Sequence, residues 1–243
     1  MNWVDRKPFA RPPARQEAAM AYDSDRGVCV LFGGGTNTFP SEIPFNDTWE
    51  WNGTSWTMRS SNDPSAANRP PPMDRPIMAY DSFRKRTVLL GSSERAGDQA
   101  KPVTRTWEWD GNIWTVHDSR TTASPAPPSR FDAAMAYDSA RRVTVVFGGR
   151  SYQSGIANDT WTWDGVAWKL AANGGTIARV HHAMAFDERR KVMVLFSGAT
   201  DLNDVNPLAF SDTSEWNGHS WTRKPFRGLH RRFASPTVSQ DVV

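Results

Sequence analysis

Four arginines precede similar stretches of the sequence, and their chemistry suits the binding of anions. Arg15, Arg75, Arg130 and Arg179 each end a short segment, written "RPPAR", "RPPPMDR", "PPSR" and "AR". A planar guanidinium group can hold a carboxylate or phosphate through two parallel hydrogen bonds. We predict that these arginines are anion ligands, and that Tyr152, the one tyrosine in a variable loop, also binds ligand. The alternative is that each arginine pairs with an aspartate or a carbonyl group of its own or the next repeat.

Histidines and aspartates with metal-binding chemistry do not form a convincing ligand set. His181 and His182 are adjacent on an expected strand, so they point to opposite faces and do not readily share one metal ion. Asp47, Asp159 and Asp212 recur just before an expected strand, where a side chain can cap the incoming loop. We therefore predict a structural role for these aspartates and no metal site.

The remaining reactive side chains do not define an active site. Cys29 is the only cysteine, which excludes an intrachain disulfide and a zinc site built from cysteines. The carboxylates of the variable loops show no spacing that indicates acid–base catalysis. They are Glu42, Glu94, Asp98, Asp201 and Asp204. We predict no catalytic residue and no cofactor.

Composition excludes several classes of protein. The chain has 243 residues, a net charge of +3 and a pI near 9.2, which is too mildly basic to indicate nucleic-acid binding. No apolar run is long enough to span a bilayer, and "MNWVDRKPFARPPAR" lacks the apolar core of a signal peptide. Because we expect sequence upstream of Met1, both a secreted or periplasmic and a cytoplasmic location stay open.

The tryptophans belong to an internal repeat of about 55 positions. Its copies are "NDTWEWNGTSW" from Asn46, "TRTWEWDGNIW" from Thr104, "NDTWTWDGVAW" from Asn158 and "SDTSEWNGHSW" from Ser211. Trp3 fits the last position of an earlier copy, so these repeats account for all 12 tryptophans. Because the tryptophans recur with the repeat, we predict that they pack one repeat against the next rather than bind a ligand.

Each repeat predicts four short strands. The first two are typified by "AAMAYD" and "VCVLF", joined by the turn "DSDRG" and followed by two glycines. The last two are "TWEW" and "SWT", joined by the hairpin turn "NG" or "DG". Four strands in a period near 50 residues predict the blades of an all-β propeller.

The combined pattern "PPAR…MAYDS…VLFGG…NDTWEWNG..W" resembles the kelch repeat, in the bacterial form related to the central domain of galactose oxidase. The resemblance implies a kelch-type β-propeller of four full antiparallel blades with partial strands at both termini. It also implies that linker arginines bind acidic peptide segments, as they do in kelch adaptor proteins. It leaves function open, because propellers serve many unrelated activities.

The repeats divide the chain into one propeller domain, 1–243. The expected blades span approximately 12–57, 70–115, 127–169 and 178–222. Residues 1–11 are expected to form the last strand of a preceding blade, and 228–243 the start of a following one. We favour a fragment of a larger ring over a small ring that closes on an incomplete fifth blade. Open ends of such an array expose inner faces and are expected to associate or fray.

The long, variable loops between the second and third strands share a face with the linkers that carry the arginines. We predict that this face makes the protein a non-catalytic binding or scaffold module for a peptide, an acidic group or a glycan.

An enzyme of the galactose-oxidase-like class is the alternative, with its catalytic residues in missing blades or in the loops. Its copper chemistry requires a cysteine-modified tyrosine, a second tyrosine and two histidines, and this constellation is absent from the sequence. The iron motif of other kelch enzymes is matched by Glu94 and Asp98, but Pro102 occupies the position of its histidine.

Overall fold

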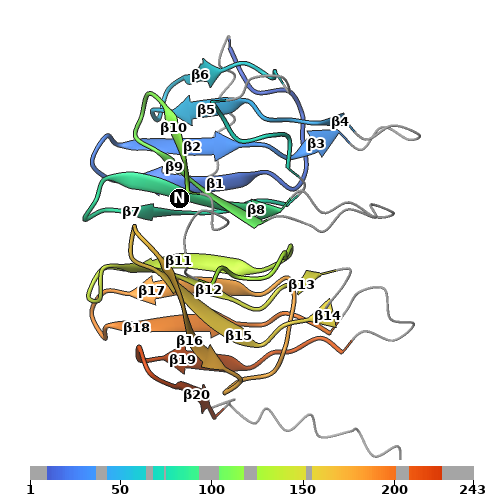
Figure 1. Ribbon diagram of the computed structural model, residues 1–243, viewed down its shortest axis with the longest axis vertical. Helices are drawn as coiled ribbons and strands as arrows, with labels where there is room; N and C mark the ends of the chain where they lie inside the picture. The colour runs from blue at the N-terminus through green and yellow to red at the C-terminus, as the bar shows by residue number, and fades with distance from the viewer. Residues whose placement is uncertain are drawn as a thin grey trace, which may run out of the picture.

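Four four-stranded antiparallel sheets make up the protein, arranged as the blades of a β-propeller (Figure 1). The computed structural model describes residues 10–36, 43–63, 68–73, 75–92, 104–117, 125–151, 155–200 and 208–225. Within these ranges the regular secondary structure consists of β-strands alone, as the sequence predicts. The same ranges contain no helix with the length and hydropathy needed to cross a membrane.

Each blade uses the four strands that the repeat predicts. The first blade consists of β1 (Ala19–Asp23), β2 (Val28–Phe32), β5 (Thr48–Trp51) and β6 (Trp56–Ser60). The second consists of β7 (Ile77–Asp81), β8 (Arg86–Ser92), β9 (Thr104–Trp109) and β10 (Trp114–His117). The third consists of β11 (Ala134–Asp138), β12 (Val143–Phe147), β15 (Asp159–Trp163) and β16 (Trp168–Asn173). The fourth consists of β17 (Ala183–Asp187), β18 (Val192–Phe196), β19 (Thr213–Trp216) and β20 (Trp221–Lys224).

Two short hairpins extend from the loops between the second and third strands of a blade. They are β3 (Gly35–Thr36) with β4 (Ile43–Pro44), and β13 (Arg150–Ser151) with β14 (Gly155–Ile156). Both lie on the same side of the molecule, opposite the turns that join β1 to β2 and β17 to β18 (Figure 1). The expected separation of a long-loop face from a short-turn face is therefore confirmed.

Consecutive blades meet through their first strands, because β1 contacts β7, β7 contacts β11 and β11 contacts β17. No comparable contact joins β1 to β17 among the described residues. The expected terminal strands concern residues 1–11 and 228–243, and of these only residues 10 and 11 lie within the described ranges.

Tryptophans of one blade form hydrogen bonds with the blade before it. Trp109 Nε1 donates a hydrogen bond to the Glu50 carboxylate at 2.9 Å, and Trp114 Nε1 donates to Thr48 Oγ1 at 2.9 Å. The same pairs recur one blade later, where Trp163 binds Glu108 and Trp168 binds Thr106. The prediction that tryptophans pack blade against blade is confirmed for these four positions. Trp51 and Trp56 of the "NDTWEWNGTSW" cluster occupy the equivalent places in the first blade and are only partly buried, because no blade precedes it among the described residues.

A glycine after the second strand lets the linker before each blade approach closely. Gly149 has a φ of +87°, and a Cβ at this position would lie 2.8 Å from the Phe131 carbonyl oxygen. Phe131 and Arg150 form a β-bridge beside it. This close packing brings the linker residues and the loop residues together on the long-loop face.

Candidate ligand-binding face

Three of the predicted arginines are buried in ion pairs with an aspartate of their own blade. Arg15 donates to both oxygens of Asp47, at 2.7 and 2.8 Å, and Arg130 to both oxygens of Asp159 at the same distances. Arg179 reaches the two oxygens of Asp212 at 2.8 and 3.1 Å. The three arginine side chains are 6, 3 and 0% exposed, in that order.

These arginines also bind the main chain. Arg130 donates to the carbonyl oxygens of Gly148 and Pro128, so one side chain connects the linker, the end of β12 and the start of β15. Burial opposes ionisation of Asp159, but the hydrogen bonds and charge of Arg130, with the Trp161 indole N–H, outweigh it and keep the Asp159 pKa below its ordinary value. Both side chains of the pair are therefore ionised, and the hydrogen bonds of Arg130 are made to groups of its own blade and linker.

Arg75 does not occupy the position equivalent to Arg15, Arg130 and Arg179, although it too ends a Pro-rich segment. Counting back from the methionine in each first strand, the residue that matches Arg15 in the second blade is Met73, which is 2% exposed. The residue that matches Asp47 is Arg105. Both members of the buried ion pair are thus replaced in this blade, and Arg75 lies two residues closer to the strand.

Arg75 instead belongs to a second set of equivalent residues, placed immediately before the first strand region of each blade. Its members share a left-handed backbone conformation: Glu17 (φ 59°), Arg75 (φ 47°), Asp132 (φ 58°) and His181 (φ 55°). Because the first strands are the ones through which blades meet, this set lies at the inner rim of the long-loop face.

The inner-rim residues contact one another across the blades. Arg75 Nε lies 3.0 Å from Glu17 Oε1, and Arg75 Nη1 lies 3.0 Å from Asp132 Oδ2. His181 Nε2 and Arg150 Nε each lie 3.6 Å from the same Asp132 oxygen. Three basic side chains therefore converge on one carboxylate oxygen. We call Glu17, Arg75, Asp132, Arg150 and His181 the inner-rim cluster.

An aromatic ring completes this cluster. The guanidinium of Arg150 lies 4.8 Å from the centre of the Phe131 ring, and that of Arg75 lies 5.6 Å from it. The side chain of Arg75 is 28% exposed and that of Asp132 is 6% exposed. The cluster thus combines two arginines, an aromatic face and partial access to solvent.

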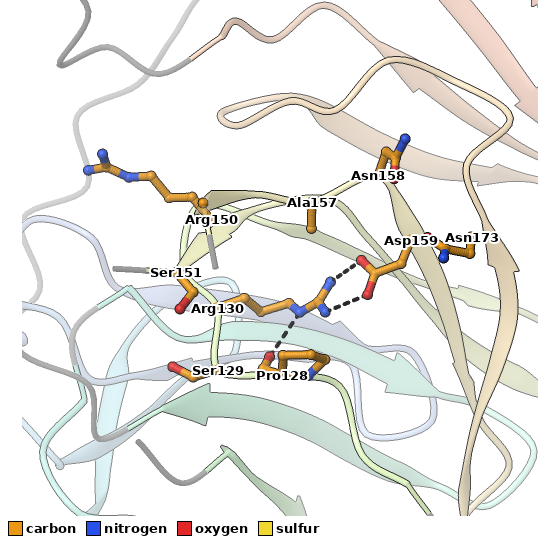
Figure 2. A pocket seen from close by; sticks show the side chains of 10 residues that line it. Pro128, Ser129, Arg130, Arg150, Ser151, Ala157, Asn158, Asp159 and Asn173 are labelled. Atoms are coloured by element: carbon orange, nitrogen blue, oxygen red, sulfur yellow. Dashed lines mark hydrogen bonds and ion pairs between the residues drawn. The ribbon is translucent and has the colours of Figure 1, made fainter. Parts of the chain in front are cut away.

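A polar cavity of about 200 Å³ adjoins the cluster in the third blade (Figure 2). Arg150 belongs to both. The Arg130–Asp159 pair forms part of the wall (Figure 2). The other lining residues are Pro128, Ser129, Ser151, Gly155, Ala157, Asn158 and Asn173. Two hydroxyl and two amide side chains belong to this lining, so it suits a small polar group that both donates and accepts hydrogen bonds.

The remaining predicted site residues are placed as follows. Tyr152 and the loop carboxylates Glu42, Glu94, Asp98, Asp201 and Asp204 lie outside the described residues. His181 is 41% exposed at its side chain and His182 is buried, so the two rings point apart as expected. Within the described ranges, no group of three or more His, Cys, Asp or Glu side chains could hold a metal ion.

Sequence reasoning did not single out Glu17, Asp132 and Arg150. Their residue types differ from blade to blade, and only their backbone conformation or bridge position is shared. The one signal in the sequence is their constant distance from the first strand of the blade. That distance identifies equivalent positions, but it does not indicate which side chains act there.

The fold and the long-loop face define a protein of the β-propeller class. No family model matches the chain, and no curated protein matches its sequence. Its fold is shared by 218 chains of known structure. One of these, described as "Structure of YjhT", aligns with a TM-score of 0.63 at 14% sequence identity, over 89% of this chain and 72% of that chain. At that identity the likeness concerns the fold alone.

Proposed function

We propose that this protein is a non-catalytic binding module of the kelch type, which holds an acidic group of a peptide partner at the inner-rim cluster. The kelch assignment is supported by the four repeats, with their paired glycines and their tryptophans in register. The observation that carries the proposed function is the convergence of Arg75 and Arg150 on Asp132 and Phe131, beside a polar cavity.

The buried arginines serve this function by holding the loops. Taking Arg15, Arg130 or Arg179 away from its aspartate would leave an uncompensated carboxylate in the blade, which costs several kcal/mol. Arg75 is different, because its partner Glu17 is 30% exposed. A carboxylate from a ligand has the same chemistry as Glu17 and can take its place at Arg75 with little loss.

The surroundings of the cluster give the ligand its further requirements. Phe131 is itself only 6% exposed, so it supports the two guanidinium groups rather than contacting the ligand, and the cavity next to Arg150 offers hydroxyl and amide groups. A peptide that carries Glu or Asp next to a small polar residue matches both features. Specificity would then come from the loops, which differ between the blades.

Binding of labelled peptides tests the proposal. The probes are fluorescein-labelled Gly-Ser hexapeptides that carry either three glutamates or three glutamines, measured by fluorescence polarisation. We expect the glutamate probe to bind at least tenfold more tightly, and Arg75→Gln or Arg150→Gln to weaken it by about 10–100-fold, which corresponds to the loss of a charge-assisted hydrogen bond.

Arg189→Gln is the matched control, because Arg189 is exposed on the β17–β18 turn, on the opposite face. This variant should bind the glutamate probe as the wild type does. Equal affinity for the two probes, or an equal loss of affinity in all three variants, would show that the inner-rim cluster does not bind acidic groups.

A further inference from the structure

The contact between neighbouring blades follows one pattern, and the first two blades show it in full. The first blade contributes a face of small and apolar residues, and the second a face that includes two tryptophans. These residues are Ala19, Ala21, Val30 and Phe32 from the first blade, and Met78, Tyr80, Trp109 and Trp114 from the second. All eight are at most 9% exposed. We call the first set the forward face of a blade and the second set its rear face.

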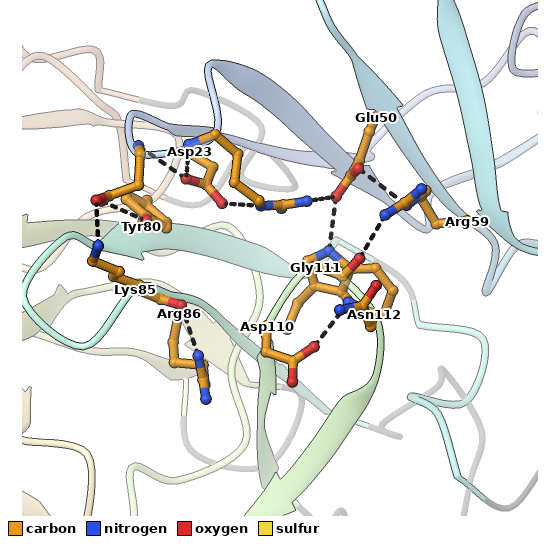
Figure 3. Close-up of polar contacts among 12 residues, drawn as sticks. Asp23, Glu50, Arg59, Tyr80, Lys85, Arg86, Asp110, Gly111 and Asn112 are labelled. Carbon is orange, nitrogen blue, oxygen red and sulfur yellow. Dashed lines mark hydrogen bonds and ion pairs between the residues drawn. The ribbon is translucent and has the colours of Figure 1, made fainter.

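Polar contacts reinforce this interface (Figure 3). Glu50, next to the forward face, is bound by Arg26 and Arg59 of its own blade and by Trp109 Nε1 of the rear face. Tyr80 of the rear face donates its hydroxyl to Asp25 at 2.8 Å. The first two interfaces therefore join indole donors on one blade to a glutamate and a threonine on the other. In the third interface Thr162 stands in place of this glutamate and Phe186 in place of Tyr80, and Trp221 Nε1 donates to Thr160 at 2.8 Å.

The rear face of the first blade is uncovered. Met20 is 59% exposed and Tyr22 is 58% exposed, whereas their equivalents Met78 and Tyr80 are 8 and 9% exposed. Nothing among the described residues lies within 4 Å of the position that a Cβ at Gly53 would occupy. At the equivalent Gly111, by contrast, a Cβ would lie 2.8 Å from the Arg26 guanidinium of the preceding blade.

The forward face of the fourth blade is also uncovered. Phe196 is 51% exposed, whereas its equivalents Phe32 and Phe147 are fully buried. Ala183 and Ala185 are exposed as well, although they match the buried Ala19 and Ala21. The fourth blade therefore presents to solvent the apolar residues that each earlier blade covers with its successor.

The polar acceptors of the fourth blade are also in place. Glu215, which matches Glu50, is bound by Arg190 and by Lys224 Nζ at 2.7 Å. Thr213 matches Thr48, the acceptor for a tryptophan of the next blade. The arrangement around Glu215 reproduces the one around Glu50, apart from the indole N–H that a following blade would supply.

We propose that a second copy of this chain packs its first blade against the fourth blade, so that copies associate head to tail. The chain itself provides the argument for this occupant. One end carries the donors and large side chains, in Tyr22, Trp51 and Trp56, and the other carries the small side chains and the acceptors Thr213 and Glu215. A second copy satisfies both ends with the apolar packing used at all three interfaces within the chain, and with the tryptophan–glutamate hydrogen bond used at two of them.

The contact joins two different surfaces, so it is heterologous. Heterologous contacts produce a closed ring when the rotation between copies closes, and an open chain of copies when it does not. In either case each interface needs one intact rear face and one intact forward face. Trp51 Nε1 then donates to Glu215 and Trp56 Nε1 to Thr213, and Phe196 is covered by the tryptophans of the next copy.

Two charge variants and their mixture test the association by light scattering after size exclusion. Wild type is expected to exceed the monomer mass of 27.2 kDa increasingly as concentration rises. Tyr22→Asp blocks the rear face and Phe196→Asp blocks the forward face, so each variant alone should elute at the monomer mass. An equal mixture should form a complex of two chains, because one intact face of each kind remains.

Val166→Asp is the control, since Val166 is 78% exposed on the turn between β15 and β16 and belongs to neither face. It should associate as wild type does. If an end variant loses its cooperative unfolding transition, Met20→Asp and Ala185→Asp replace the pair on the same two faces. A wild-type protein that stays monomeric at all concentrations would overturn the proposal. A mixture that stays monomeric would also overturn it.

Discussion

Replacing Arg130 by methionine tests whether the buried ion pairs hold the long-loop face together. Arg130 donates to both oxygens of Asp159 and to the carbonyl oxygens of Gly148 and Pro128, and its side chain is 3% exposed. The second blade carries Met73 at this position, so methionine is compatible with the backbone there. The substitution therefore removes the charge and the hydrogen bonds while the space stays largely filled.

The structure sets the size of the expected loss. The Asp159 side chain is only 14% exposed, so the variant leaves a buried carboxylate without its cation. Removing one partner of a buried ion pair costs about 3–5 kcal/mol, and we expect the free energy of unfolding at pH 7 to fall by about this amount. The double variant Arg130→Met/Asp159→Asn should recover part of the loss, because no uncompensated charge remains.

The pH dependence of this loss provides a second, independent check. Arg130 keeps the Asp159 pKa below its ordinary value, so the stabilisation is present above the unfolded-state pKa of about 3.9 and is lost as pH falls through the folded-state pKa. In the variant burial opposes ionisation without that cation. The stability gap between variant and wild type should therefore narrow as pH falls from 7 to 4.

Urea unfolding, followed by tryptophan fluorescence, measures the free energy of unfolding at pH 7 and its change between pH 7 and pH 4. Arg189→Met, on an exposed turn, is the control and should unfold as wild type does. A loss smaller than about 1 kcal/mol at pH 7, or a gap that does not change with pH, would refute the assignment of the pair as a structural anchor.

Two other positions give predictions from the same structure. Trp109→Phe removes the hydrogen bond to Glu50 between the first two blades, and should lower the free energy of unfolding by about 1.5–3 kcal/mol in urea titrations. The same change at Trp51, which is partly exposed at the uncovered end, should cost distinctly less, and equal losses would contradict the interface model. Burial, with the positive charge of Arg179, lowers the pKa of His182 to about 4. Because this folded-state pKa lies below the unfolded-state value of about 6.5, stability should fall by about 3 kcal/mol between pH 6.5 and pH 4, and His182→Ala should flatten that slope in unfolding curves.

The blades follow from local sequence, and the inner-rim cluster does not. Strand identity in each blade was readable because alternation, the paired glycines and the "NG" or "DG" turn act over a few residues. For the buried arginines the sequence predicted a partner that is either an aspartate or a carbonyl group, and it could not choose between them because either satisfies a guanidinium group. The Pro-rich segments all end in arginine, so the displacement of Arg75 by two residues shows only in its distance from the following methionine.

By itself, the sequence determined the all-β class, the four repeated units and the role of the tryptophans between blades, because equivalent residues make equivalent contacts wherever a neighbouring blade is present. Only the tertiary structure decided which basic side chains meet. Arg75 from one blade, Asp132 and Arg150 from the next and His181 from the fourth are brought together by the packing of first strands around the inner rim. Contacts of this kind join residues far apart in the chain whose types do not repeat, so no local pattern encodes them. The uncovered end faces depend on tertiary structure for the same reason, since Met20 and Met78 have the same local sequence and differ only in whether a preceding blade covers them.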